Sequence, residues 1–560
     1  MAESTAIEAR DSNGHTEYLQ PRARKPGPMQ FAKLGLNSDD VQAGKTNGAL
    51  REALKETASD ISSGRTTPIP ADAPPSVQAS SSARRQIRAE QRQRIFPTVE
   101  YVDRVSHFDP TSDYHDFKGF FVLFWIGLAV MVLTSMLRNM KETGYPLIIR
   151  QWGLFTERVW ELGLSDGAMV FSTAVSLPLH RLFMSSRVFR WHGLGMAIQS
   201  LYQTGWLAFW TTWPFIRNWS WTAQVFFTLH LLAIGMKMHS YAFYLGHLSE
   251  TRRRLNDLDT PDTASKSAAY RYPRPRSHLH EIPQSPTYER TEKDKFNDAA
   301  LKQLREDLAL ELASPLGNVS YPENLTLANY ADFILCPTLC YEIEYPRTPK
   351  IRWMELFYKT LAVAGCIFLM TVTAEEFVLP VLDEASVQLQ DANSASEFLL
   401  ILGETIGRML FPFMVIFLLV FLSIFEYTLG AFAEITRFAD RQFYADWWNS
   451  SDWLEFSREW NKPVHHFFRR HVYSASKTHV SRPVATVITF FISALAHELV
   501  LGCITRKFRG YGFFAMMLQM PFVMIQRSRL GRGKDLLNNV LFWCSMILGL
   551  SMMCALYVLV

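Results

Sequence analysis

One stretch of the chain indicates the class of fold: Ala485-Thr-Val-Ile-Thr-Phe-Phe-Ile-Ser-Ala-Leu-Ala-His-Glu-Leu-Val-Leu-Gly-Cys-Ile504. A helix of about 20 almost wholly apolar residues is long enough to cross the hydrocarbon core of a bilayer. His497 lies inside this stretch. Lipid offers an imidazole no hydrogen-bond partner, so the ring must face protein or a water-filled cavity. The stretch therefore predicts a membrane helix whose histidine either takes part in chemistry or ion movement, or bonds to a neighbouring helix.

Similar apolar segments recur along the chain, and we interpret about nine of them as transmembrane helices. The chain has 560 residues, of which 48% are hydrophobic and 13% aromatic. We therefore expect an all-α, multi-pass membrane protein. The expected spans are Phe120–Leu137, Gly167–Phe183, Leu194–Phe215, Thr222–Tyr244, Met354–Leu382, Phe398–Phe425, Pro483–Ile504, Gly510–Ile525 and Leu536–Val560.

Two polar regions interrupt this pattern. Residues 1–107 cannot bury enough apolar surface to offset their ordering entropy, so we expect a disordered cytosolic tail before a membrane domain at residues 108–560. Residues 252–321 are expected to form a cytosolic, partly disordered insert. Basic residues favour a cytosolic N-terminus and a cytosolic or interfacial segment at 437–482.

Composition also narrows the chemistry that the chain can perform. The six cysteines have no pair spacing, which predicts neither a disulfide framework nor a zinc site. The sequence contains no metal-ligand cluster and no phosphate-binding glycine loop. We therefore expect no bound metal, no resident cofactor and no nucleic-acid partner.

The residues that could carry chemistry gather before the span that holds His497. The segment Phe443-Tyr-Ala-Asp-Trp-Trp-Asn449 is unusually aromatic, and such rings favour the membrane–water interface, where they could serve only as an anchor. Asn461 and His465 are four residues apart and would share one face of a helix. Asn461 could equally cap that helix, and His465 could be an ordinary interfacial residue.

Together these segments resemble the membrane-bound O-acyltransferase superfamily, and more narrowly its branch of sterol and diacylglycerol O-acyltransferases. The resemblance covers roughly Phe108 to Val560. Within the branch, the tail after His497 and the segments around Glu344 and Trp353 are most similar to fungal sterol O-acyltransferases. Further supporting stretches are Met238-His-Ser-Tyr-Ala-Phe-Tyr244, Pro337-Thr-Leu-Cys-Tyr-Glu-Ile-Glu-Tyr-Pro-Arg-Thr348, Ile351-Arg-Trp353 and Arg437-Phe-Ala-Asp-Arg441.

The resemblance implies a cage of helices around a chamber in the endoplasmic reticulum membrane. Long-chain acyl-CoA, the co-substrate, would enter from the cytosol and a membrane sterol from the bilayer, and the protein would form a homo-oligomer, a dimer or a tetramer. His497 is implied as the catalytic base, with Asn461 and His465 also needed for activity. The implied substrate-binding residues are Phe443, Tyr444, Asp446, Trp447, Trp448, Asn449, Trp460, Tyr473, Arg482 and Ser493.

These residue types suit a direct transfer. A neutral imidazole can take the hydroxyl proton as the alcohol oxygen attacks the thioester. Asn461 or His465 could donate to the negative charge that develops on the carbonyl oxygen. No nucleophilic Ser/His/Asp or Cys/His set is evident in the sequence, so we expect no acyl-enzyme.

Other functions remain possible from the sequence. Diacylglycerol or a specialised lipid alcohol could replace the sterol, and a lumenal protein could be the acyl acceptor. A transporter could use His497 as a proton relay, but we find no related halves with paired broken helices.

Overall fold

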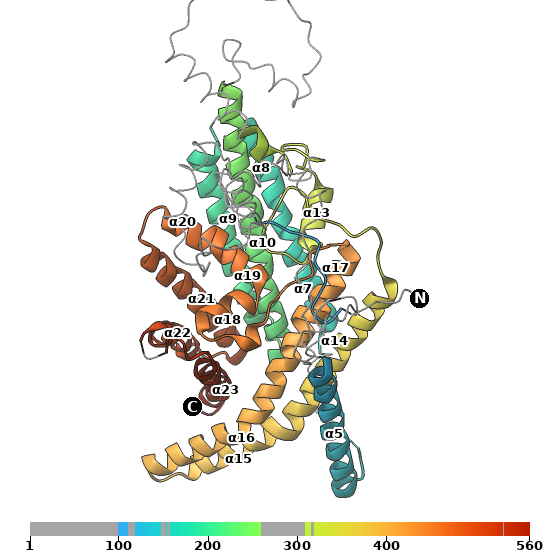
Figure 1. The fold of residues 1–560 in the computed structure, drawn as a ribbon, viewed down its shortest axis with the longest axis vertical. Coiled ribbons are helices and arrows are strands. Elements are labelled where there is room, and N and C mark those ends of the chain that lie inside the picture. The colour runs from blue at the N-terminus through green and yellow to red at the C-terminus, as the bar shows by residue number, and fades with distance from the viewer. Residues whose placement is uncertain are drawn as a thin grey trace, which may run out of the picture. The chain divides into compact units, whose positions relative to one another are not determined.

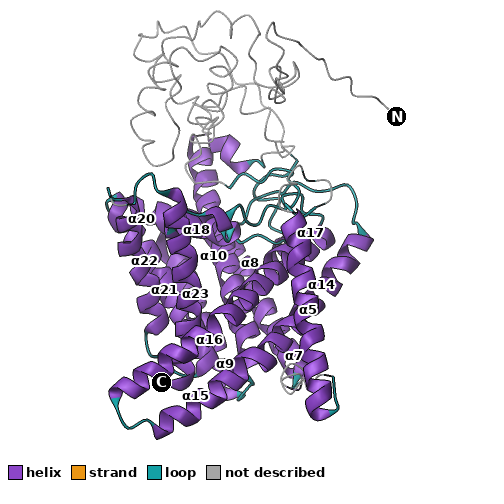
Figure 2. Cartoon of the chain, turned by 60° about the horizontal axis from the view of Figure 1, so that its bottom comes forward, coloured by secondary structure: helices purple, strands orange, loops and turns teal. Residues whose placement is uncertain are grey.

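The computed structural model describes residues 99–109, 112, 118–146, 153, 157–186, 188–258, 308–314, 318–529 and 531–560. In this part of the chain the secondary structure is helical, and extended backbone pairs only at isolated bridges (Figures 1 and 2). The prediction of an all-α fold is confirmed. The α-helices are α5 (Lys118–Thr143), α7 (Val159–Ser172), α8 (Ser176–Ser185), α9 (Met196–Ile216), α10 (Trp221–Leu258), α13 (Leu327–Leu335), α14 (Trp353–Thr373), α15 (Leu379–Asp391), α16 (Ala395–Phe421), α17 (Leu429–Thr436), α18 (Trp453–Glu459), α19 (Lys462–Phe467), α20 (Ser474–Lys477), α21 (Arg482–Thr505), α22 (Tyr511–Arg527) and α23 (Asp535–Leu559).

Six helical segments of the described residues are long and apolar enough to cross a membrane. The remaining three expected spans coincide with α9, α10 and α22, which are helical but less apolar or shorter. A multi-pass membrane protein is therefore confirmed. The six segments are Phe121–Thr143, Val159–Ser185, Trp353–Asp391, Ala395–Thr436, Arg482–Thr505 and Asp535–Leu559.

Two of these segments are much longer than a bilayer requires. Trp353–Asp391 has 39 residues and Ala395–Thr436 has 42. At about 1.5 Å per residue each exceeds the roughly 30 Å hydrocarbon core, so each must tilt or project from the membrane. Short π-helical turns interrupt both, η3 (Ala374–Val378) and η4 (Leu422–Thr428). α15, which follows η3, packs beside α16, which precedes η4 (Figure 1).

The helix that carries His497 is surrounded by several neighbours. α21 packs against α10, α22 and the π-helical turn η6 (Phe468–Tyr473), and α10 in turn packs against α9 (Figure 1). Local sequence sets the two ends of α21. Pro483 lies in its first turn, where a missing N–H costs no helical bond, and Arg506 ends it in a left-handed conformation with φ 56°.

The largest buried cluster is aromatic. It brings together Tyr241 of α10, Tyr341 of the loop after α13, Phe438 and the pair Tyr444 and Trp447. Tyr241 and Tyr341 meet edge to face with ring centroids 4.8 Å apart. Such pairs add to the stability gained from burial alone. The core therefore joins the membrane helices to the segment between α17 and α21.

The structure describes the inner ends of both expected polar regions. Residues 99–107, which were expected to belong to a disordered tail, are bonded to the helical domain. The ends of the expected insert also belong to the fold. α10 continues to Leu258, and the apolar side chains of Leu308, Leu312 and Tyr321 are buried in the main cluster. The rest of the tail, 1–98, and of the insert, 259–307 and 315–317, lies outside the described residues.

Candidate active site

His497 lies on the interior side of α21. Leu495 is 49% exposed and apolar, as suits a lipid-facing residue, and at about 100° per residue it points some 200° away from His497. Phe490, seven residues before His497, shares its stripe of the helix and is buried. The ring of His497 is nevertheless accessible to solvent. His497 is therefore an accessible imidazole on the protein side of a membrane helix.

A backbone hydrogen bond selects the tautomer of His497. Its Nδ1 lies 2.8 Å from the carbonyl oxygen of Ser493, one turn earlier. A carbonyl oxygen can only accept, so Nδ1 carries the proton in the neutral ring and Nε2 keeps its lone pair. A neutral ring in this state has its basic nitrogen available for a proton from a substrate.

Glu498, the next residue, has a different role, which the sequence did not reveal. Its Oε1 accepts from Gly510 N at 2.7 Å, and its Oε2 accepts from Phe513 N at 3.2 Å and from Tyr557 Oη at 2.8 Å. The carboxylate thus satisfies backbone donors at the start of α22 and ties α21 to α22 and α23. The sequence showed only that Glu498 points away from His497.

Asn461 and His465 occupy the start of α19. Asn461 is the N-cap, and its Oδ1 accepts from Val464 N at 3.1 Å. His465 follows one turn later, and its backbone N donates to Asn461 O at 2.9 Å. The structure bears out the capping geometry that the sequence allowed, and the capping bond leaves the amide nitrogen of Asn461 available as a donor. η6 packs on both α19 and α21, so a shared neighbour links the two candidate helices.

The environment of α19 keeps its two histidines neutral. Burial lowers the pKa of His465 to about 4, with contributions from His466 and Arg469 in the same direction. Burial likewise lowers the pKa of His466 to about 4, and Arg469 and Lys462 add to this effect. A neutral imidazole can still donate one hydrogen bond, so His465 can serve as a donor at neutral pH without carrying charge.

The segment Phe443–Asn449, which we term the aromatic motif, is mostly a packing element. Trp447 is 1% exposed, and its ring lies 4.9 Å from that of Trp460 and 5.5 Å from that of Phe417 on α16. Tyr444 is also buried and donates from its hydroxyl to Glu426 at 2.9 Å. These rings attach the motif to α16 and η4. Direct contact of the motif with a substrate stays a prediction.

The remaining members of the motif differ in how far their side chains are exposed. Phe443 is buried, whereas Asn449 is exposed. The carbonyl of Trp448 accepts from Asn539 Nδ2 at 3.0 Å and from Trp543 Nε1 at 3.2 Å, which fastens the motif to α23. Asp446 is 45% exposed and lies 3.4 Å from Nε2 of His107.

Tyr473 and Arg482 lie close to the ends of helices. Tyr473 is the last residue of η6, and Arg482 is the first residue of α21, with the short α20 between them. Both side chains are partly exposed. They therefore lie on the same side of the domain as the N-terminal end of α21, and their proposed contact with acyl-CoA stays a prediction.

Two buried polar pairs were not recognised from the sequence. His471 Nε2 lies 2.8 Å from Ser240 Oγ, and this hydroxyl also accepts from Tyr341 N at 2.9 Å. Arg470 is buried and pairs with Glu342 at 2.9 Å. Arg470 is one of several basic residues before α21, and its pairing inside the protein gives it a structural role. The partners of Arg470 and His471 lie 128 and 231 residues away along the chain, separations that local patterns do not reveal.

Known proteins resemble this chain over most of its length. The profile of the membrane-bound O-acyltransferase family matches residues 205–559. The probable sterol O-acyltransferase 2 of Schizosaccharomyces pombe is 38% identical over 447 residues, which cover 79% of this chain and 87% of that protein. The sterol O-acyltransferase 2 of Saccharomyces cerevisiae is 32% identical over 473 residues, 82% of this chain and 69% of that protein.

A diacylglycerol enzyme matches a shorter part. The diacylglycerol O-acyltransferase 1 of Dictyostelium discoideum is 32% identical over 263 residues, 47% of this chain and 42% of that protein. Profile and relatives agree on the class of protein. The chain belongs to the membrane-bound O-acyltransferase family, and it is a multi-pass membrane acyltransferase.

Proposed function

We propose that the protein is an acyl-CoA:sterol O-acyltransferase of the endoplasmic reticulum membrane, which transfers a fatty acyl group to the hydroxyl of a sterol. One observation carries the proposal: the similarity to fungal sterol O-acyltransferases extends over 87% of the Schizosaccharomyces pombe relative. The hydrogen bond from Nδ1 of His497 to Ser493 O, which leaves Nε2 as the basic nitrogen, supports it. Acyl-CoA is a co-substrate, and the protein forms a homo-oligomer, a dimer or a tetramer.

His497 acts as the base in this proposal. Its Nε2 takes the proton of the sterol hydroxyl as that oxygen bonds to the thioester carbonyl carbon. The C–S bond then breaks, and the imidazolium returns the proton to the leaving CoA sulfur. The products are a steryl ester and free CoA, so the ring ends the cycle neutral.

Asn461 and His465 stabilise the transition state. The amide nitrogen of Asn461 and the neutral imidazole of His465 are donors for the negative charge on the carbonyl oxygen. The low pKa of His465 favours this role, because the ring does not gain a charge near neutral pH. Phe443, Trp447 and Trp460 shape the cytosolic side of the site, and Tyr473, Arg482 and Ser493 lie along the acyl-CoA path.

The test offers two acyl acceptors in competition. Microsomes that contain the protein are incubated with labelled oleoyl-CoA, a sterol and diacylglycerol, and the labelled lipids are separated. We expect labelled steryl ester from the wild-type protein and none above background from His497→Ala. Labelled triacylglycerol without steryl ester would assign the protein to the diacylglycerol enzymes instead.

A further inference from the structure

Residues 99–109, which we term the strap, run along the segment that follows α17. Arg104 N donates to Ala439 O at 3.2 Å, and Arg441 N donates to Arg104 O at 2.8 Å. The side chain of Arg104 also donates from Nε to Asp440 Oδ1 at 2.9 Å, and a second bond forms from Nη2 to the other oxygen. Bidentate pairs of this kind fix orientation as well as distance. The strap is therefore held to this segment by both backbone and side chain.

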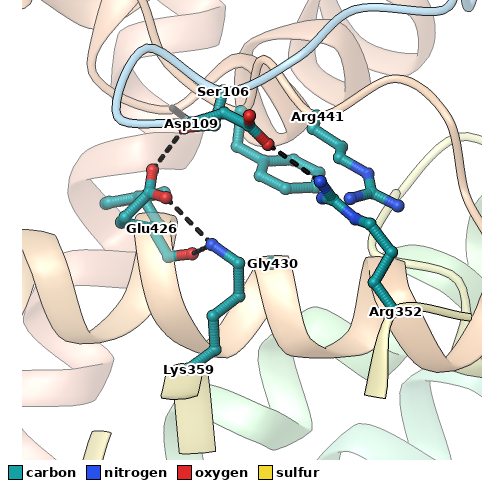
Figure 3. Close-up of a pocket in the computed structure, with 9 residues that line it drawn as sticks. Ser106, Asp109, Arg352, Lys359, Glu426, Gly430 and Arg441 are labelled. Carbon is teal, nitrogen blue, oxygen red and sulfur yellow. Dashed lines mark hydrogen bonds and ion pairs between the residues drawn. The ribbon is translucent and has the colours of Figure 1, made fainter. Parts of the chain in front are cut away.

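A second attachment begins two residues further along the chain, at Ser106, in the pocket shown in Figure 3. Ser106 donates to Glu426 of η4, whose carboxylate also binds Lys359 at 3.0 Å and the hydroxyl of Tyr444 at 2.9 Å. Asp109 pairs with Arg352 at 3.2 Å. Ser106 thus shares the carboxylate of Glu426 with Tyr444 of the aromatic motif and with Lys359 of α14. Asp109 pairs with the residue that precedes α14.

Aromatic contacts complete the attachment. The ring of Phe108 lies 4.6 Å from that of Phe121 on α5 and 6.5 Å from that of Tyr444. The ring of His107 lies 5.3 Å from that of Tyr444. The strap therefore touches the first described membrane helix and the aromatic motif at the same time.

The motif in turn holds the start of α19. Ala445 N donates to Glu459 O at 2.9 Å, and Lys462 N donates to Phe443 O at 2.9 Å. These two bonds enclose Asn461, which lies between Trp460 and Lys462. A displacement of the motif would consequently move the N-cap of α19 and the turn that carries His465.

We propose that the strap is a positioning element for acyl transfer, and that Arg104 is its principal residue. This inference rests on the proposed function, because it assumes that Asn461 must be placed accurately against the thioester. Asp440 is 5% exposed, whereas Arg104 is 35% exposed. Loss of Arg104 removes the cation that pairs with this buried carboxylate and leaves it the 3.3 Å bond from Val102 N, so the segment must shift to hydrate the charge. Shifts of about 1 Å can reduce turnover by roughly 100-fold without any direct contact with the reacting atoms.

The test compares Arg104 variants of the full-length protein in a pure, folded state. We expect Arg104→Met to lower kcat by about tenfold or more, with the KM for sterol changed little. Arg104→Lys should give an intermediate kcat, because it keeps the charge but loses the bidentate geometry. Asp103→Asn is the matched control, since it alters an exposed charge next to Arg104 and should turn over normally. Arg104→Met with a kcat per folded molecule close to wild type would overturn the proposal.

A double variant separates positioning from a general loss of packing. Asp440→Asn removes the carboxylate that Arg104 neutralises, so Arg104→Met/Asp440→Asn should be no slower than the slower single variant. A double variant whose loss of kcat equals the product of the two single losses would overturn the proposal. If Arg104→Met does not fold, Ser106→Ala tests the second attachment, and unchanged turnover in that variant would overturn it. A wild-type protein that makes no steryl ester would refute the proposed function instead.

Discussion

At the scale of single residues, His497 combines a basic nitrogen with a fixed tautomer. The bond from Nδ1 to Ser493 O leaves Nε2 as the base. We expect His497→Ala to reduce turnover by about 100-fold or more, the lower end of general-base contributions, while thermal stability changes little. Steryl ester formation by the purified variant checks this. Turnover near the wild-type rate would remove His497 from the mechanism.

Glu498 should matter for a different reason. Its carboxylate accepts bonds from Gly510, Phe513 and Tyr557, so its removal leaves donors at the start of α22 without a partner. We expect Glu498→Ala to destabilise the protein by roughly 2–3 kcal/mol. Tyr557→Phe should cost less, about 1–2 kcal/mol, because it removes one of the three bonds to Glu498 and the bond that Gly512 N donates to the Tyr557 hydroxyl at 3.2 Å. Thermal unfolding in detergent measures both, and an unchanged melting temperature in Glu498→Ala would contradict the capping role.

The low pKa of His466 predicts a loss of stability in acid. Between about pH 6.5 and 4 the unfolded chain binds a proton at this residue and the folded protein does not, so acidification favours unfolding. The loss of stability is absent above about pH 6.5 and reaches roughly 1–2 kcal/mol by pH 5. We expect His466→Gln to lose less stability than wild type between pH 7 and pH 5. Equal losses in melting temperature would show that another group is responsible.

Some of this residue-scale detail could be predicted from the sequence. Asn461 precedes Lys-Pro at a helix start, and that local pattern indicated the cap that the structure contains. The partners of Glu498 lie 12, 15 and 59 residues away, so no local pattern could identify them. The sequence also favoured substrate contact for Trp447, although the burial of its ring depends on α16 and α23.

At the scale of elements, the aromatic motif packs between helices and is not mainly a substrate-contacting surface. Trp447 is 1% exposed and contacts rings from α16, α18 and α23. We expect Trp447→Ala to destabilise the protein by about 3–5 kcal/mol, the usual cost of removing a buried aromatic ring. Asn449→Ala, in the exposed part of the same motif, is the control and should cost less than about 0.5 kcal/mol. Similar melting temperatures for the two variants would contradict the packing role.

The lengths of the apolar segments predicted where the membrane helices lie, but not the π-helical turns that interrupt them. All nine expected spans coincide with helices, because the hydrophobic segments are long and their ends are marked by polar residues. The π-helical turns η3 and η4, which contact α14 and α16, were not predicted from local composition. The strap was missed because a polar sequence of this kind is ordered only by partners such as Asp440 and Glu426.

At the scale of the whole molecule, the orientation in the membrane decides whether acyl-CoA can reach His497. Acyl-CoA is made in the cytosol and is strongly charged, so in the proposed orientation its path begins on the cytosolic side, where we expect α18, α19 and α20 to lie. His497 is 15 residues after the start of α21. At 1.5 Å per residue this is about 22 Å, beyond the midplane of a hydrocarbon core of roughly 30 Å. The thin pantetheine arm can extend to such a depth, while a sterol can arrive from the lipid.

Chemical labelling of single cysteines tests this orientation. Ala475 of α20 and Ala395 at the start of α16 are both exposed, whereas Ser450, in the same segment as α20, is buried and would label poorly whatever the orientation. In sealed microsomes an impermeant maleimide should modify Ala475→Cys, and it should modify Ala395→Cys only after the vesicles are opened. A Cys544→Ser background removes the exposed native thiol. The reverse pattern would place α19 and α20 in the lumen, where cytosolic acyl-CoA could not reach Asn461 and His465.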